Sequence, residues 1–91
     1  MAQWLFFPDY RGSLPYQDLL ARALAEVSGG WVAARAGTIT DALEAPGDGP
    51  VVFHLHWEDA VHAGAADEAA AAARIDAFLA ELAGFAASGG I

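Results

Sequence analysis

The chain has 91 residues, of which 56% are hydrophobic and 18% are charged, and its formal net charge is −8. This length suffices for one domain, and the high apolar content excludes a typical disordered chain. The few basic residues are all scattered arginines, which argues against nucleic-acid binding and against attraction to an anionic membrane. The absence of cysteine excludes disulfide bonds and thiolate metal sites.

The amino terminus lacks a positive region and a long apolar stretch, and the alanine run 65–73 is interrupted by Asp67 and Glu68. We therefore expect no signal peptide, no membrane span and a cytoplasmic location. There is no GxGxxG fingerprint, and we expect no cofactor.

The chain begins with an expected strand and helix. Gln3–Phe7 is a short apolar run closed by Pro8, which predicts a buried strand and a loop. Ser13 and Pro15 favour a helix start, and Gly29-Gly30 favours a left-handed helix end. The expected apolar stripe of this helix is Leu19, Leu20, Ala23, Leu24 and Val27.

Trp31–Ala34 predicts a second strand, and Thr38–Ala45 a short helix that Pro46 ends. Asp41 and Glu44 have the spacing of a capping box. We expect Trp31, like Trp4, to lie in the core.

The turn Gly47–Pro50 precedes the clearest strand, Val51–Trp57, with the sequence VVFHLHW. Its side chains alternate, so His54 and His56 share one side with Val52, while the other side is wholly apolar. Glu58–Gly64 is expected to be a loop.

Asp67 and Glu68 favour the start of a last helix. Its expected apolar stripe is Ile75, Phe78, Leu79, Leu82 and Phe85. Ser88-Gly89-Gly90 ends this helix, and the apolar Ile91 that follows predicts the start of another strand.

Alternation of strands and helices predicts an α/β fold, with three parallel strands and helices on both faces of the sheet. We expect one partial, Rossmann-like domain over residues 1–91 that stops before its next strand, with Val51–Trp57 beside the first strand.

Parallel sheets bind ligands at the carboxyl ends of their strands, which selects the segments 8–13 and 54–62. The first leads into a helix amino terminus that favours anions, with Arg11 and Ser13 nearby. An ordinary strand-to-helix turn is the alternative.

The second segment holds His54, His56 and His62 with Glu58 and Asp59, which are ligand types for a divalent metal. A substrate-binding or acid/base histidine is favoured over a metal site. The adjacent carboxylates of Glu58 and Asp59 could either act as a general base or simply be solvated in a loop. Trp57 could either stack on a sugar or be buried in the core.

Two stretches, WLFFPDYRGSLPYQDLLARAL and VVFHLHWED, together resemble the amino-terminal domain of bacterial GT-B glycosyltransferases that build exopolysaccharides. The run FLAELAGFAASGGI is similar to the helix before that domain's next strand. The resemblance covers nearly the whole chain.

The resemblance implies a part that binds a sugar or lipid-linked sugar acceptor, whereas the nucleotide-sugar donor belongs to a carboxyl domain that these residues lack. Transfer by the 91 residues alone is therefore not expected. His56 and Glu58 are the implied catalytic residues. The expected substrate-binding residues, with His62 added from its place in the second segment, are Tyr10, Arg11, Gly12, Ser13, Tyr16, Trp57 and His62.

Two other functions stay open. One is a non-catalytic assembly module that pairs with another chain, and the other is a small metal-binding protein that uses His54, His56 and His62. The expected partners are a donor-binding domain or another copy of the chain. We expect a homodimer of the isolated chain, formed through the Val51–Trp57 edge or by exchange of the last helix.

Overall fold

A computed structural model describes residues 1–9, 15–45, 49–56 and 58–91. Its centre is a three-stranded parallel sheet of β1 (Ala2–Phe7), β2 (Val32–Ala36) and β3 (Val51–Leu55), in the order β2-β1-β3. Trp4 lies opposite Ala34 of β2 and Val52 of β3. The predicted α/β class, the three parallel strands and the position of β3 beside β1 are confirmed.

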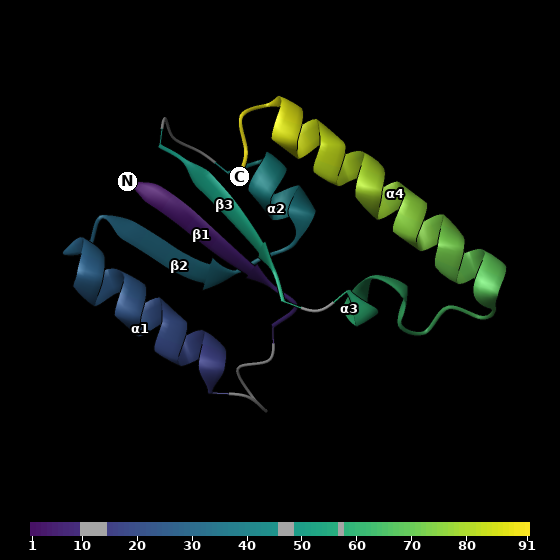
Figure 1. Ribbon diagram of the computed structural model, residues 1–91, viewed down its shortest axis with the longest axis horizontal. Coiled ribbons are helices and arrows are strands. Elements are labelled where there is room, and N and C mark those ends of the chain that lie inside the picture. The colour runs from purple at the N-terminus through teal and green to yellow at the C-terminus, as the bar shows by residue number, and fades with distance from the viewer. Residues whose placement is uncertain (10–14, 46–48, 57) are drawn as a thin grey trace.

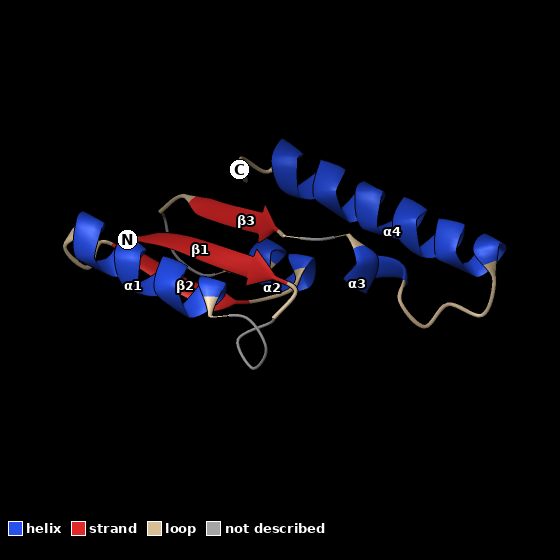
Figure 2. Cartoon of the chain, turned by 60° about the horizontal axis from the view of Figure 1, so that its bottom comes forward, coloured by secondary structure: helices blue, strands red, loops and turns tan. Residues whose placement is uncertain are grey.

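Helices lie on both faces of the sheet (Figures 1 and 2). α1 (Tyr16–Ser28) packs along β2, and this side of the sheet is the α1 face. α2 (Ile39–Leu43) and α4 (Glu68–Ala87) cover the opposite side, the α4 face, and α3 (Asp59–His62) packs against α4. Among the helices of the described residues, none combines the length and apolar character that crossing a membrane requires.

In Figure 1, α1 lies beside β2 at one side of the sheet and α4 lies at the other, while α2 packs on Leu5 of the central strand β1. The Cα positions extend over 45 × 32 × 14 Å, so the molecule is thin along one axis. On the α1 face, Phe6 of β1 is buried, whereas Trp4 of β1 and Val52 and His54 of β3 are only partly buried.

A cluster of buried apolar side chains lies on the α4 face, and Phe6 of β1 is buried on the opposite face. Leu5 of β1 is fully buried and packs with Ile39 and Ala42 of α2 and with Phe85 of α4. Partly buried side chains surround this cluster, namely Val51, Phe53, Phe78 and Leu82. This arrangement follows from the alternation in β3, whose wholly apolar side meets the two helices.

The helix ends follow local chemistry. Gly29 takes the left-handed conformation, with φ of 63°, and ends α1 as predicted. The capping box of α2 uses Thr38 and Asp41, so the prediction that Asp41 pairs with Glu44 is wrong. The reason is that Thr38, with its hydroxyl, occupies the cap position one residue before the helix. The Asp67 carboxylate accepts from the Ala70 N–H and caps α4.

Five apolar side chains that the sequence placed in the core or in a core-facing stripe are exposed. On α1 the face towards the sheet holds Gln17, Leu20 and Leu24, whereas Leu19, Ala23 and Val27 of the predicted stripe face solvent. Trp31 is 55% exposed and Leu79 is 54% exposed. Because α1 contacts mainly β2, only one of its apolar stripes packs against the sheet.

One expected loop and several element boundaries also differ from the prediction. The expected loop Glu58–Gly64 contains the helix α3, which packing against α4 stabilises. β3 ends at Leu55, and β2 extends beyond Ala34 to Ala36. Pro46 and Trp57, and the first two residues of the turn Gly47–Pro50, lie outside the described residues.

Ile91 pairs with the outer edge of β3. Its N–H donates to the Val51 carbonyl at 3.0 Å, and its carbonyl accepts from the Phe53 N–H at 2.9 Å. Two bonds that flank one residue in this way are the pattern of a parallel ladder. Ile91 thus lies in parallel register against the outer edge of β3.

Candidate functional site

Tyr16 and His56 meet at the carboxyl edge of the sheet. His56 directly follows β3, and its backbone N–H donates to the Phe7 carbonyl at 2.8 Å, which holds it beside the end of β1. Its imidazole stacks on the ring of Tyr16, the first residue of α1, with 5.2 Å between ring centroids and 23° between planes. Tyr16 is 46% exposed and His56 is half-buried, so a ligand can reach the pair.

His54 lies behind this pair on the same side of β3. The Trp4 indole N–H donates to His54 Nδ1 at 3.3 Å, and the two rings meet edge to face. A neutral imidazole that accepts at Nδ1 carries its own proton on Nε2, so this contact selects one tautomer. The His54 and His56 rings are 6.3 Å apart and nearly perpendicular.

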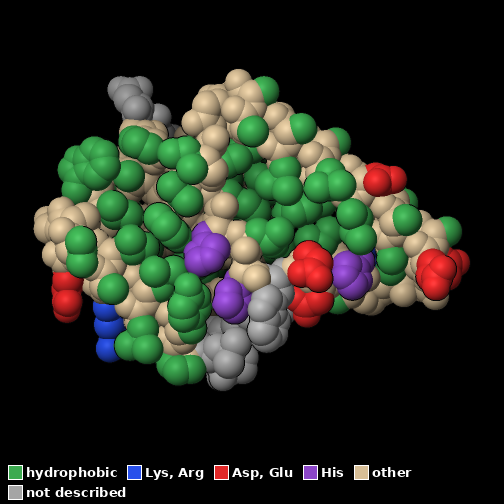
Figure 3. Space-filling model, viewed as in Figure 1, with side chains coloured by type: hydrophobic (Ala, Val, Ile, Leu, Met, Phe, Trp, Pro, Cys, Tyr) green, Lys and Arg blue, Asp and Glu red, His purple; other side chains and the backbone are tan. Residues whose placement is uncertain are grey.

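Burial lowers the pKa of His54, and the neighbouring His56 lowers it further because two imidazolium charges would repel. The bond from Trp4 acts in the same sense, since protonation of Nδ1 would remove its acceptor. His54 is therefore the neutral, fixed member of the histidine pair. Figure 3 shows histidine side chains among apolar ones on this surface.

Gln17 fixes the start of α1 near the site, a role that the sequence did not reveal. Its side chain is only 1% exposed, and its amide donates to the Pro8 carbonyl just after β1. A buried amide that pairs with a backbone carbonyl is a specific tie between two segments. It places Tyr16, its neighbour in sequence, beside the end of β1.

The remaining predicted site residues have different positions. Glu58 is exposed and immediately precedes α3, while His62 is half-buried in the last turn of that helix. Among the described residues, no three histidine or carboxylate side chains gather in a geometry that suits a metal ion, so His62 does not join His54 and His56. Tyr10, Arg11, Gly12, Ser13 and Trp57 lie outside the described residues.

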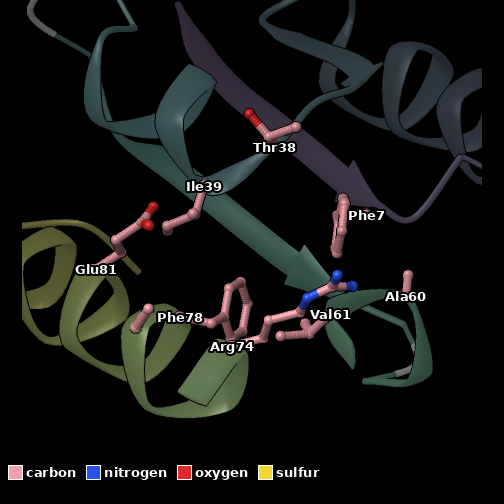
Figure 4. Close-up of a pocket in the computed structure, with 9 residues that line it drawn as sticks. Phe7, Thr38, Ile39, Ala60, Val61, Arg74, Phe78 and Glu81 are labelled. Atoms are coloured by element: carbon pink, nitrogen blue, oxygen red, sulfur yellow. The ribbon is translucent and has the colours of Figure 1, made fainter. Parts of the chain in front are cut away.

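A pocket of about 310 Å³ lies on the α4 face at the carboxyl end of β1 (Figure 4). Phe7, Ile39 and Phe78 give it an apolar lining, and the Arg74 side chain crosses it to donate to the Ala63 carbonyl at 2.8 Å. None of the predicted site residues that the structure describes lines it. Its lining residues come from segments far apart in the chain, so no local sequence motif predicts this pocket.

No protein-family model, no curated protein and no solved structure matches this chain.

Proposed function

We propose that this chain forms the acceptor side of a GT-B-type glycosyltransferase, with the acceptor bound at the Tyr16–His56 pair. The observation that supports this most is the stacking of the His56 ring on Tyr16 at the carboxyl edge of a parallel sheet. Open α/β sheets bind their ligands at that edge. An aromatic ring beside an imidazole offers an apolar surface and a hydrogen-bonding group, both of which suit a sugar.

In the proposed reaction His56 accepts the proton of an acceptor hydroxyl. The hydroxyl oxygen attacks the anomeric carbon of the donor sugar, and the bond from that carbon to the phosphate oxygen of the nucleotide breaks. The donor is held by a part of the enzyme outside these 91 residues, as the resemblance implies. His54, held neutral by burial and by its bond from Trp4, keeps a second positive charge away from His56.

The proposal also assigns expected roles to the other predicted residues. Glu58 supplies a carboxylate near the hydroxyl, and His62 a further polar contact. Tyr10, Arg11, Gly12 and Ser13 bind the substrate in the segment after β1. Trp57 offers an additional ring to the sugar.

The test is an NMR titration of the labelled chain with methyl β-glucoside as the probe acceptor. We expect His56→Gln to weaken binding about tenfold, the loss of one good hydrogen bond of about 1.4 kcal/mol. Tyr16→Phe should bind nearly as well as the unchanged chain, whereas Tyr16→Ala should bind more weakly because it lacks the ring.

Asp76→Asn, on the exposed side of α4, is the control and should leave the affinity unchanged. Equal affinity of His56→Gln and the unchanged chain would refute the assignment of the acceptor to this pair. His62→Gln tests separately whether α3 belongs to the site.

A further inference from the structure

The pocket on the α4 face is formed by four elements of the chain. The end of β1, the start of α2, the helix α3 and one side of α4 each contribute to its walls. Its lining residues lie between positions 7 and 81, whereas Ile91 pairs with Val51 at the amino end of β3. The walls of this pocket are therefore made without the residues at the end of the chain.

Aromatic and aliphatic side chains form the floor of the pocket. The Phe78 ring stacks on that of Phe7, with 6.4 Å between centroids and 28° between planes. Phe53 lies 6.0 Å from Phe7 and 6.2 Å from Phe78, so the three rings hold one another in place. Ile39 is buried in the adjacent cluster and completes the apolar lining. Such a floor suits a further aromatic ring, because stacking between rings adds to the effect of apolar burial.

Arg74 brings a positive charge to this apolar surface. Its guanidinium donates to the Ala63 carbonyl at 2.8 Å, and Figure 4 shows it directed towards Phe7 and α3. A guanidinium has five N–H donors in a planar fork, so donors remain for a carboxylate ligand. Within the part of the chain that the structure describes, no carboxylate pairs with Arg74. The bond to Ala63 holds the cation in place beforehand, which lowers the entropy cost of binding an anion.

Glu81 restricts the ligand at the opposite side of the pocket, where it lies beside Ile39 in Figure 4. Because like charges repel, its carboxylate disfavours a second anionic group at that end. The volume of about 310 Å³ is near the lower end of the roughly 300–1,000 Å³ range of small-molecule sites. Size and charge together therefore favour a compact ligand with one carboxylate.

We propose that this pocket binds a small aromatic monocarboxylate. The carboxylate pairs with the Arg74 guanidinium, the ring lies against Phe7 and Phe78, and the uncharged end of the ligand points towards Glu81. This assignment is independent of the proposed glycosyl transfer, because neither member of the Tyr16–His56 pair lines the pocket.

The test is an NMR titration of the full chain with hydrocinnamate and, as the matched ligand, its uncharged amide. We expect hydrocinnamate to bind saturably and to shift the ring protons of Phe7 and Phe78. The amide should bind about tenfold more weakly, because it lacks the charge-assisted bonds to Arg74. This comparison needs no variant of the protein and therefore does not depend on whether a variant folds.

Two variants assign the charges. Arg74→Gln should weaken the binding of hydrocinnamate about tenfold and leave that of the amide unchanged, which also shows that the pocket keeps its shape. Arg22→Gln, on the exposed side of α1, makes the same change of net charge and is the control. Hydrocinnamate with a second carboxylate at the para position of its ring should bind more weakly than hydrocinnamate, and Glu81→Gln should restore its binding.

Three results would overturn the proposal. They are equal affinity for the acid and the amide, the absence of saturable shifts at Phe7 and Phe78, and an affinity for the acid that Arg74→Gln leaves unchanged. Shifts of these rings that grow with protein concentration in the absence of ligand would also overturn it, because they would assign the pocket to a second copy of the chain.

Discussion

The two faces of the sheet differ in what covers them. On the α4 face Leu5 is buried under Ile39 and Phe85, in a layer of interlocking apolar side chains. On the α1 face the neighbouring residue of the same strand, Trp4, makes a hydrogen bond to His54 and remains partly open to solvent. β1 thus packs into this layer through Leu5, while its other side combines the buried Phe6 with the polar contact of Trp4.

This difference indicates a division of roles. Apolar burial stabilises the fold through the cluster on the α4 face and through Phe6 on the α1 face, since each fully buried large side chain contributes about 1.5–3 kcal/mol. The α1 face and the adjacent carboxyl edge hold the stacked Tyr16–His56 pair and the tautomer-selecting contact of Trp4 with His54. Changes on the two faces should therefore have separable effects on stability and on acceptor binding.

The largest effect is expected from Phe85→Ala on the α4 face. The substitution leaves a cavity beside Leu5 and should lower the free energy of unfolding by about 3–5 kcal/mol. The free energy of unfolding of a typical domain is only about 5–15 kcal/mol. The urea unfolding transition should therefore shift to a much lower urea concentration or disappear. Leu79→Ala on the exposed side of the same helix is the control. Similar losses for both variants would contradict the position of the core.

Gln17→Ala should have the next largest effect. It leaves the Pro8 carbonyl without its buried donor, which costs about 1–3 kcal/mol of stability. The same change should loosen the stacking of Tyr16 on His56, seen as shifts of their ring protons. Asp18→Asn, one residue further along the exposed side, is the matched control. Undisturbed ring protons would show that Gln17 does not position the pair.

A smaller effect on stability is expected when a change of pH titrates His54. Its pKa in the folded chain is lower than its ordinary value of about 6.5, so between these values the unfolded chain binds more protons. Stability should therefore fall as the pH is lowered through about 6.5 and level off below the folded pKa. His54→Gln keeps an acceptor but does not titrate, and should weaken this dependence. An unchanged slope of unfolding free energy against pH in that variant would assign the dependence to other groups.

The smallest effect is expected from zinc. Because His62 lies on α3 and does not gather with His54 and His56, zinc at about 100 µM should leave the melting temperature unchanged. Calorimetry is the more sensitive check. A micromolar-affinity zinc isotherm that His54→Ala abolishes would reinstate the metal-binding alternative.

The sequence was sufficient for the order of elements, because turn residues separate segments of clear periodicity. The alternation in VVFHLHW predicted which side of β3 packs on helices. The sequence did not reveal which side of α1 faces the sheet. Apolar residues form more than one stripe on this helix, and the stripe that faces the sheet begins with the polar Gln17. α3 was missed because a single turn of helix depends on contacts with α4 that are distant in sequence.

The candidate site was predictable only in part. The rule that ligands bind at the carboxyl ends of parallel strands selected His56, and the resemblance added Tyr16. The stacking of these two rings and the bond from Trp4 to His54 depend on strand register and on the placement of α1. Neither is expressed in local sequence, because the paired residues are separated by 40 and 50 positions.

The most direct test of this account is a residue-resolved NMR map of where methyl β-glucoside binds the full chain. The account predicts saturable shifts of the Tyr16 ring and the His56 imidazole, with the rings of Phe78 and Phe85 unchanged. Shifts confined to Phe7, Arg74 and Phe78 would place the ligand in the pocket on the α4 face and would contradict the division of roles between the two faces.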